Sequence, residues 1–216
     1  MVSVIFDAMS ETRKRRSREG TLRKSDQTRE AIVLAALEFF WDHPFRDLTV
    51  GGLMSDVGAS RPTFYQYFSD LHELMSALLD SLRDDIMEAA ALWFVGEGDP
   101  VPRLKVSLEG LVNVCYEKGT LVRAVAEASV SDAGLEKNWN KFLKGFDDAV
   151  AATIQQQQEE GLIPSFAAFP MAVALNRLDA SLMIEHFGRR PRGNREQVLA
   201  TITRIWCSTL YGISGE

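Results

Sequence analysis

The chain has 216 residues, of which 46% are hydrophobic and 25% are charged. This composition is typical of a globular protein with enough apolar side chains for a core, and it excludes disordered and fibrous chains. The net charge of −6 argues at first against a nucleic-acid partner. However, residues 1–30 hold eight Arg or Lys and five acids, so the remaining 186 residues carry −9. A basic end on an acidic body is expected where one end of a protein meets phosphate.

Cys115 and Cys207 lie far apart in apolar runs, and the sequence has no Cys-x-x-Cys pair. We therefore expect buried, reduced thiols in a cytoplasmic protein. No apolar segment with the features of a signal peptide follows the basic run, and no uncharged apolar stretch approaches the ~18 residues of a membrane-spanning helix. The sequence thus predicts no membrane partner, and it leaves open whether translation starts at Met1 or Met9.

Apolar residues recur with the helical period along the whole chain, and sustained two-residue alternation is absent, so we predict an all-α fold. Residues 1–24 are interpreted as a flexible basic arm. Residues 25–70 are interpreted as a three-helix DNA-binding domain of the helix-turn-helix type, with helices at about 26–43, 50–57 and 61–68, the first capped by Ser25 or Asp26 and ended by Pro44. Residues 71–216 are interpreted as a helical ligand-binding and dimerisation domain. Its helices are expected at about 71–95, 101–117, 119–130, 132–160, 167–187 and 194–212, with a clear break at 96–100.

The most informative segment is Thr49 to Phe68, in which Gly58-Ala59-Ser60 joins two short capped helices at helix-turn-helix spacing. Four apolar residues fall where they would pack inward against the first helix: Leu53, Val57, Phe64 and Phe68. The outward side chains suit a DNA groove, because Arg bonds a guanine edge or a phosphate, Thr meets a thymine methyl and Tyr reaches phosphate. The candidate DNA-binding residues are Thr49, Ser60, Arg61, Pro62, Thr63, Tyr65 and Tyr67. By spacing alone, an ordinary helical hairpin with aromatic packing remains open.

At these positions the chain resembles the TetR/AcrR family of transcriptional regulators. The matching residues are Ile32, Ala35, Ala36, Phe40, Thr49, Gly58, Ser60, Thr63, Tyr65 and Phe68. Further strings, Ser60 to Tyr65, Ala174-Leu175-Asn176 and Ile205-Trp206 to Tyr211-Gly212, are similar to a mycobacterial member of that family. The resemblance implies that the third helix enters the major groove, that the last two helices form a dimer interface, and that a pocket in the body controls the spacing of two DNA-binding heads.

Four residues depart from the family pattern. Leu71 stands where the family usually has a phosphate-binding Lys, and Tyr67 stands where it usually has His. Gly51-Gly52 replaces residues that favour a helix, at a cost of about 1 kcal/mol for each glycine relative to Ala. These departures leave open whether DNA binding is weakened.

Most aromatic residues of the body are expected to belong to its core, but one polar pair suggests a pocket. Asn176 and Asp179 stand three residues apart on a helix face that is otherwise apolar, and buried polar groups need partners. Either a ligand supplies that partner, or Asp179 pairs with Arg177, Arg204 or solvent. If Asp179 lines a cavity, the small apolar ligand would carry a cation or a hydrogen-bond donor. The candidate lining residues are Leu108, Val112, Trp139, Phe142, Phe146, Asn176, Asp179, Met183 and Trp206.

The last two predicted helices carry apolar residues on more than one face, which favours a homodimer through these helices. A dimer suits a near-palindromic double-stranded operator, whose half-sites lie about 34–36 Å or a multiple of that distance apart. We therefore interpret the chain as a repressor that a small ligand releases from its operator. The alternative is a ligand-binding or scaffold protein without DNA binding. No motif supports an enzyme, a cofactor or a metal site, because the three His residues are scattered and Gly-rich phosphate loops are absent.

Overall fold

The computed structural model describes residues 24–213, and this part of the chain folds into nine α-helices and one 3-10 turn without a strand. The prediction of an all-α fold is confirmed. The predicted arm at 1–24 lies outside the described residues, apart from Lys24, with which the first described helix begins.

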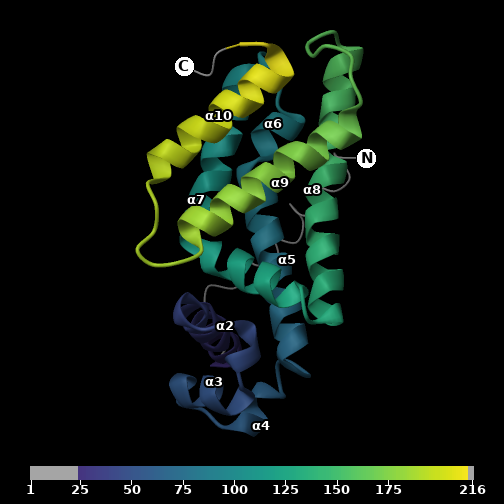
Figure 1. Cartoon of the computed structure of the whole chain (residues 1–216). Helices are drawn as coiled ribbons and strands as arrows, with labels where there is room; N and C mark the ends of the chain where they lie inside the picture. The colour runs from purple at the N-terminus through teal and green to yellow at the C-terminus, as the bar shows by residue number, and fades with distance from the viewer. Residues whose placement is uncertain (1–23, 214–216) are drawn as a thin grey trace.

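We refer to the first three described helices as the head and to the other six as the body. The head contains α2 (Lys24–Asp42), the 3-10 turn η1 (Phe45–Asp47), α3 (Val50–Val57) and α4 (Arg61–Phe64). The body contains α5 (Leu71–Ala89), α6 (Ala91–Val95), α7 (Pro100–Ser129), α8 (Ala133–Glu159), α9 (Ala168–Phe187) and α10 (Arg195–Tyr211). The head forms one end of an elongated molecule, and α5 runs from it along the middle of the body (Figure 1).

Capping residues set several helix boundaries. The Asp70 side chain accepts a hydrogen bond from the Glu73 amide at 2.8 Å and starts α5, while Asp132 accepts from the amides of Gly134 and Leu135 and starts α8. Gly212 takes the left-handed conformation at φ 66° and ends α10. Such caps supply partners for the unpaired amides and carbonyls at the ends of a helix.

Three boundaries differ from the sequence-based prediction. The first helix begins at Lys24, so Ser25 and Asp26 lie inside it and are not its cap. The helix expected at 71–95 divides at Ala90, because the Ser107 hydroxyl from α7 donates to the Ala90 carbonyl at 3.1 Å and accepts from the Trp93 amide at 3.0 Å. The helix expected at 61–68 is α-helical only to Phe64 and then tightens into a turn.

A fourth difference is the break expected at Lys118-Gly119, since α7 continues through it. A side chain at residue 119 would lie 2.7 Å from the Phe187 carbonyl oxygen and 2.8 Å from the Phe187 Cβ. Gly119 therefore serves a close approach of α7 to the end of α9 and does not end a helix.

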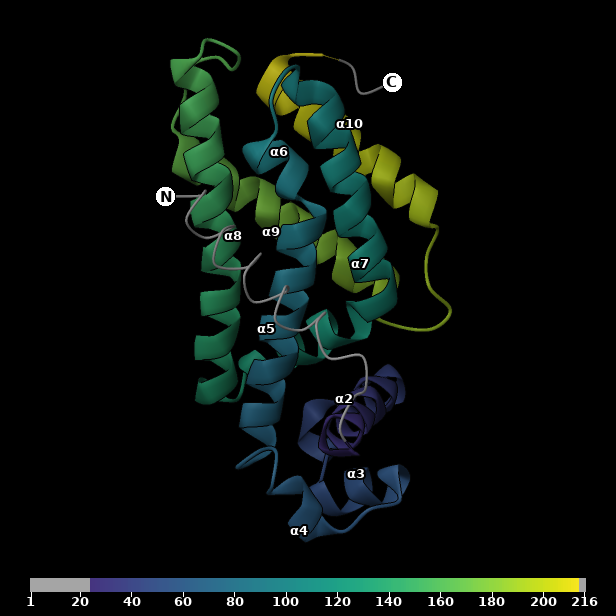
Figure 2. The same ribbon diagram turned by 180° about the vertical axis from the view of Figure 1, so that it is seen from behind.

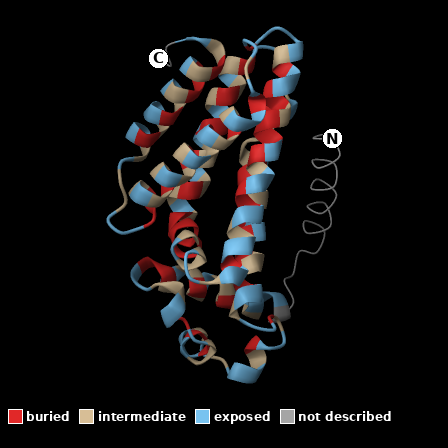
Figure 3. Ribbon diagram, turned by 45° about the vertical axis from the view of Figure 1, so that its right-hand side comes forward, coloured by how far each residue is buried: buried red, intermediate tan, exposed pale blue. Residues whose placement is uncertain are grey.

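Buried residues run along the whole length of the body and continue into the head (Figure 3). The apolar ones among them form one core cluster. In the head, Leu53, Phe64 and Phe68 are buried as expected and pack with α2, whereas Val57 is only half-buried. Burial of each side chain of this size stabilises the fold by about 1.5–3 kcal/mol.

Both cysteines are buried, free thiols. None of the helices within residues 24–213 is long and apolar enough to cross a membrane.

Candidate DNA interface and ligand cavity

The outer end of the head is formed by α3 and α4, which a sharp turn joins (Figure 2). The Thr49 hydroxyl accepts from the Gly52 amide at 3.1 Å and caps α3 as predicted. Gly58 takes the left-handed conformation at φ 71°, and its amide closes the end of α3 on the Met54 and Ser55 carbonyls. This geometry lets the chain reverse within a few residues, as a helix-turn-helix requires.

The seven candidate DNA-binding residues come from the start of α3 and from α4 with its flanking turns. Five of them are exposed, namely Thr49, Ser60, Arg61, Pro62 and Tyr65, while Thr63 and Tyr67 are half-buried. Tyr65 is 60% exposed, although its ring packs edge-on against the fully buried Phe64 at a centroid distance of 5.5 Å. Such a rigid, exposed phenol held by the core is well placed for a partner surface.

Ser60 occupies the position before α4 but does not cap an amide with its side chain. Its hydroxyl is instead 2.9 Å from the hydroxyl of Thr63. The pair fixes two neighbouring hydroxyls on the outer side of α4.

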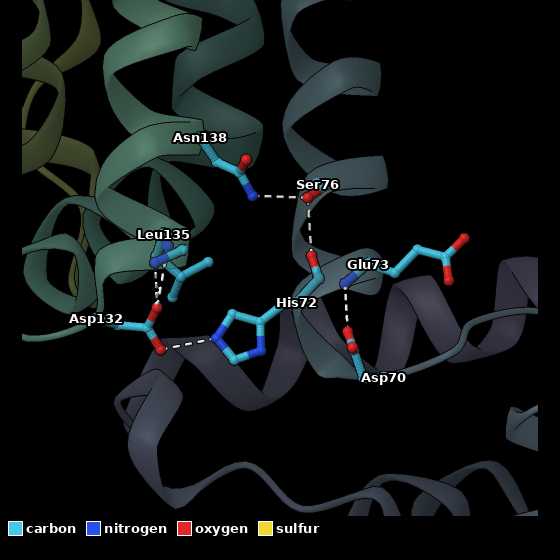
Figure 4. Close-up of polar contacts among 8 residues, drawn as sticks. Asp70, His72, Glu73, Ser76, Asp132, Leu135 and Asn138 are labelled. Atoms are coloured by element: carbon cyan, nitrogen blue, oxygen red, sulfur yellow. Dashed lines mark hydrogen bonds and ion pairs between the residues drawn. The ribbon is translucent and has the colours of Figure 1, made fainter.

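The first turn of α5 joins the head to the body. It contains Leu71, which stands where the family usually has Lys. Leu71 is half-buried and packs against the core. The next residue, His72, reaches α8, where its Nε2 lies 2.7 Å from the Asp132 carboxylate that caps that helix (Figure 4). This contact lowers the pKa of Asp132. One turn further, the Asn138 amide donates to the Ser76 hydroxyl at 2.7 Å.

The body encloses an apolar cavity between α5, α6, α7, α8, α9 and α10. Seven of the nine candidate residues line it: Leu108, Phe142, Phe146, Asn176, Asp179, Met183 and Trp206. The other two do not. Val112 is fully buried in the core, and Trp139 stacks on Phe142 at a centroid distance of 5.4 Å. Further lining residues include Ile86, Trp93, Phe94, Leu104, Ser107, Leu111, Cys115, Leu143 and Val150.

Asp179 is the ionisable carboxyl group in the cavity wall, and it is 95% buried. The Trp206 indole nitrogen lies 3.1 and 3.2 Å from its two oxygens. Burial raises the pKa of Asp179 to about 7, although the Trp206 hydrogen bond opposes the rise. A carboxyl group that is desolvated without a cationic partner retains its proton more strongly than one in water.

Asn176 is oriented by a carboxylate outside the predicted set. Its amide nitrogen donates to Asp147 at 2.9 Å, and Arg177 pairs with the same carboxylate at 2.8 and 3.1 Å. Arg177 therefore pairs with Asp147 and not with Asp179. Because the Asn176 amide donates to Asp147, its carbonyl oxygen keeps its capacity to accept a hydrogen bond.

Comparison with known proteins identifies the family. The model "Transcriptional regulator EthR, C-terminal domain" matches residues 104–212, and the model "Bacterial regulatory proteins, tetR family" matches residues 32–78. The chain belongs to the TetR family of transcriptional regulators. It is therefore a regulator of the helix-turn-helix, DNA-binding type, as the head geometry indicates.

Two relatives confirm the resemblance to a mycobacterial member of the TetR family. The HTH-type transcriptional regulator EthR of Mycolicibacterium smegmatis is 27% identical over 212 residues, which span 94% of this chain and 95% of that protein. EthR of Mycobacterium tuberculosis H37Rv is 29% identical over 199 residues, spanning 89% and 91% of the two chains.

Solved structures of other regulators share the fold. A putative TetR-family regulator from Syntrophomonas wolfei has a TM-score of 0.72 at 15% identity and covers 86% of this chain and 95% of its own. A putative transcriptional regulator from Pseudomonas aeruginosa PAO1 has a TM-score of 0.70 at 18% identity, with coverages of 89% and 94%.

Sequence reasoning missed two features of this TetR-family cavity. Trp93 donates its indole N–H to Tyr211 at 2.9 Å and packs edge-on against Trp206, but as one of many body aromatics it was not distinguishable from the core. Asp147 is buried although it lies beside the exposed Asp148 in a polar stretch. Its pairing with Asn176 spans 29 residues, so local periodicity carried no signal for it.

Among residues 24–213, no group of three or more His, Cys, Asp or Glu could hold a metal ion.

Proposed function

We propose that this TetR-family regulator is a homodimeric repressor that leaves its operator when a small ligand fills the cavity. The observation that carries the proposal is the course of α5. This helix begins directly after the head, and Ile86 near its far end lines the cavity. One helix therefore connects the cavity to the DNA-binding end, so a ligand that prefers one position of α5 shifts the head with it.

The DNA contacts are assigned to α4 and its surroundings. Arg61, Thr63 and Tyr65 would meet base edges or phosphates in the major groove, with Ser60, Pro62 and Tyr67 beside them and Thr49 at the start of α3. The exposure of Arg61 and Tyr65 supports this role, because neither side chain is needed to fill the core. The operator would be a near-palindrome, since two symmetric heads read two symmetric half-sites.

The dimer interface is assigned to α9 and α10. These helices form an outer layer of the body, and within residues 24–213 no other helix covers their outer sides (Figure 1). Both contribute to the core, yet further apolar side chains on them are only partly buried, among them Met171, Leu178, Leu182, Ile184, Leu199 and Ile205. Pairing with the same two helices of a second copy would bury these side chains in a four-helix interface.

The ligand is assigned to small molecules with an apolar body and a basic nitrogen. The cavity wall is apolar apart from a few groups, of which Ser107 already bonds to backbone on α6 and at Ala90. Asp179 has a single N–H donor in Trp206, which leaves acceptor capacity on both carboxylate oxygens. An ammonium group at that point would supply the missing donor and the opposite charge.

The proposal is tested by fluorescence anisotropy of the full chain against DNA upstream of its own gene, at two salt concentrations, with scrambled DNA as control. We expect tight, sequence-selective and salt-sensitive binding by a dimer. 4-Phenylbutylamine should then release the DNA at lower concentration than 4-phenylbutan-1-ol, which has the same skeleton without the charge. The outcome that would favour a ligand-binding or scaffold protein is a folded dimer that binds no DNA, neither the upstream DNA nor any sequence selected from a random pool.

A further inference from the structure

We propose that Arg123 is a positioning residue for operator binding, because it fixes the orientation of the DNA-binding head relative to the body. This inference rests on the proposed function above, since it concerns how the two heads of a dimer are spaced. Arg123 lies in α7, near the head and outside the candidate DNA interface, and it is 97% buried.

The sequence at the end of α2 leaves one backbone carbonyl without its usual hydrogen-bond donor. In a continuing helix, the Phe40 carbonyl would accept from the amide of residue 44, but residue 44 is proline and has no amide hydrogen. Phe40 is fully buried, so water cannot take the place of that donor. A buried carbonyl without a partner costs about 1–3 kcal/mol.

Arg123 supplies the missing donor from the body. Its Nη2 donates to the Phe40 carbonyl, and its Nε donates to the Gly188 carbonyl at 2.8 Å. Gly188 closes the C-terminal end of α9. One guanidinium therefore joins the ends of two helices, one in the head and one in the body, where a cation also interacts favourably with both helix dipoles.

The guanidinium is held in this position by its surroundings. Glu127, one turn along α7, accepts from Nη1 at 2.7 Å and also pairs with the exposed Arg189. A side chain at residue 188 would lie 2.9 Å from the Arg123 Cβ, so glycine allows the loop to pack directly on the arginine. A planar group with fixed donor directions and three partners defines an angle between elements, which a single flexible contact would not do.

A second, exposed contact reinforces the same joint. Arg190, two residues after Gly188, pairs with Glu38 of α2 at 2.8 and 3.1 Å and lies 4.5 Å from the Trp41 ring centroid. Arg192 also lies over Trp41, at 5.6 Å. Since exposed ion pairs contribute little, the buried contact of Arg123 should dominate the orientation of the head.

The position of Arg123 has a consequence for the spacing of the operator half-sites. If Arg123 fixes the angle of each head, the dimer should demand one separation of half-sites. One base pair added between the half-sites moves them ~3.4 Å apart along the axis and turns one against the other by about a tenth of a helical turn. A head held rigidly cannot follow both changes, whereas a loosely held head can.

The test compares Arg123→Lys and Arg123→Met with the wild-type dimer on an operator found by selection, and on the same operator with one base pair inserted or deleted at its centre. The Lys variant keeps the buried charge and stem but cannot serve three partners in fixed directions. Arg189→Gln is the matched control, because it removes an arginine from Glu127 without touching the head.

For the Lys variant we expect about a tenfold loss of affinity for the selected operator, as for a lost hydrogen bond to a charged group. Its preference for that operator over the two altered spacings should fall, while Arg189→Gln keeps both values. The Met variant should show the same change more strongly. Equal losses on all three spacings, or wild-type behaviour of the folded Lys variant, would overturn the proposal. If the wild-type dimer itself selects no operator, the proposed function fails instead.

Discussion

The guanidinium of Arg61 in α4 lies against the α-carbon of Gly51 in α3. A side chain at residue 51 would come within 2.7 Å of the Arg61 Nε and 2.8 Å of its Cζ, closer than real Cβ contacts allow. The glycine that weakens α3 by its intrinsic helix preference is therefore what lets Arg61 lie across the start of that helix. Because Gly51 has no side chain, the Arg61 guanidinium has room to lie next to the other candidate DNA contacts.

This relationship predicts an unusual effect of Gly51→Ala. The added methyl displaces the guanidinium, so we expect operator affinity to fall by about tenfold, the scale of one good side-chain contact to DNA. Thermal unfolding should change little or shift upward, because Ala favours a helix over Gly by about 1 kcal/mol. Anisotropy and calorimetry measure the two effects separately.

Gly145→Ala provides the control for that experiment. Gly145 lies in α8, far from the head, and a side chain there would meet only the Arg83 Cδ at 4.0 Å. It should gain the same helix preference without any change in DNA binding. If Gly51→Ala binds the operator as tightly as Gly145→Ala, the position of Arg61 against Gly51 is irrelevant to recognition.

Arg61→Ala and Tyr65→Ala should each weaken operator binding strongly, and together they should abolish it. Both side chains are exposed, so neither loss opens a cavity in the core, and dimerisation and the melting temperature should stay as in the wild type. A bidentate base contact alone is worth about 1–3 kcal/mol. Lys137→Ala, an exposed change on α8, is the control. Wild-type affinity of the double variant would remove α4 from the DNA interface.

Local signals predicted the head better than they predicted the cavity. Thr49, Gly58 and Pro44 each determine backbone geometry within four residues, so α3, its turn and the end of α2 were readable from the sequence. Gly119 is a glycine like Gly58, but it allows close contact with Phe187, 68 positions away in the sequence. The sequence-based prediction wrongly placed a break between two helices there. Long-range proximity of this kind leaves no periodic trace.

For the cavity, too, local spacing predicted some lining residues, whereas contacts between distant segments could not be predicted. Helical spacing placed Asn176 and Asp179 on one inward face, and both line the cavity. Spacing could not show which neighbouring aromatic residues reach the open space. Trp139 stands only three residues before Phe142, yet it stacks on that ring and does not line the cavity. The partner of Asn176 was likewise set by the packing of α8 on α9.

Removal of residues 1–23 should weaken binding to all DNA sequences alike. The head segment 24–70 holds four basic and seven acidic residues, so its own charge repels phosphate, whereas residues 1–23 hold six basic residues and only three acids. Binding that depends on the arm should therefore lose salt dependence when the arm is removed, by about 0.9 in the log–log slope for each lost phosphate contact.

This truncation leaves α2 whole, because that helix is bounded by Lys24 and Asp42. Its melting temperature should therefore match the full chain, and a titration at four salt concentrations gives the slope. An unchanged slope would show that the arm makes no phosphate contacts, and the DNA affinity would then have to come from the head alone.

Asp179 should make the protein less stable as the pH rises toward neutrality. Burial raises the pKa of this carboxyl to about 7 from 3.8. Between these values the folded protein binds a proton that the unfolded chain has released, so the stabilisation is complete below about pH 4 and is lost as the pH rises to about 7. Asp179→Asn has no proton to lose there and still offers an acceptor to Trp206.

We therefore expect the stability of Asp179→Asn relative to the wild type to increase by about 3 kcal/mol per protomer between pH 5 and pH 8, measured by urea unfolding of the dimer without ligand. Asp148→Asn is the matched control, because Asp148 pairs with Lys144 in an exposed position on the same body. A relative stability of Asp179→Asn that does not change with pH would mean that Asp179 is ionised throughout. The carboxylate would then need a cation or water in the cavity to stabilise it, and the preference for 4-phenylbutylamine over its alcohol should be independent of pH instead of rising above pH 7.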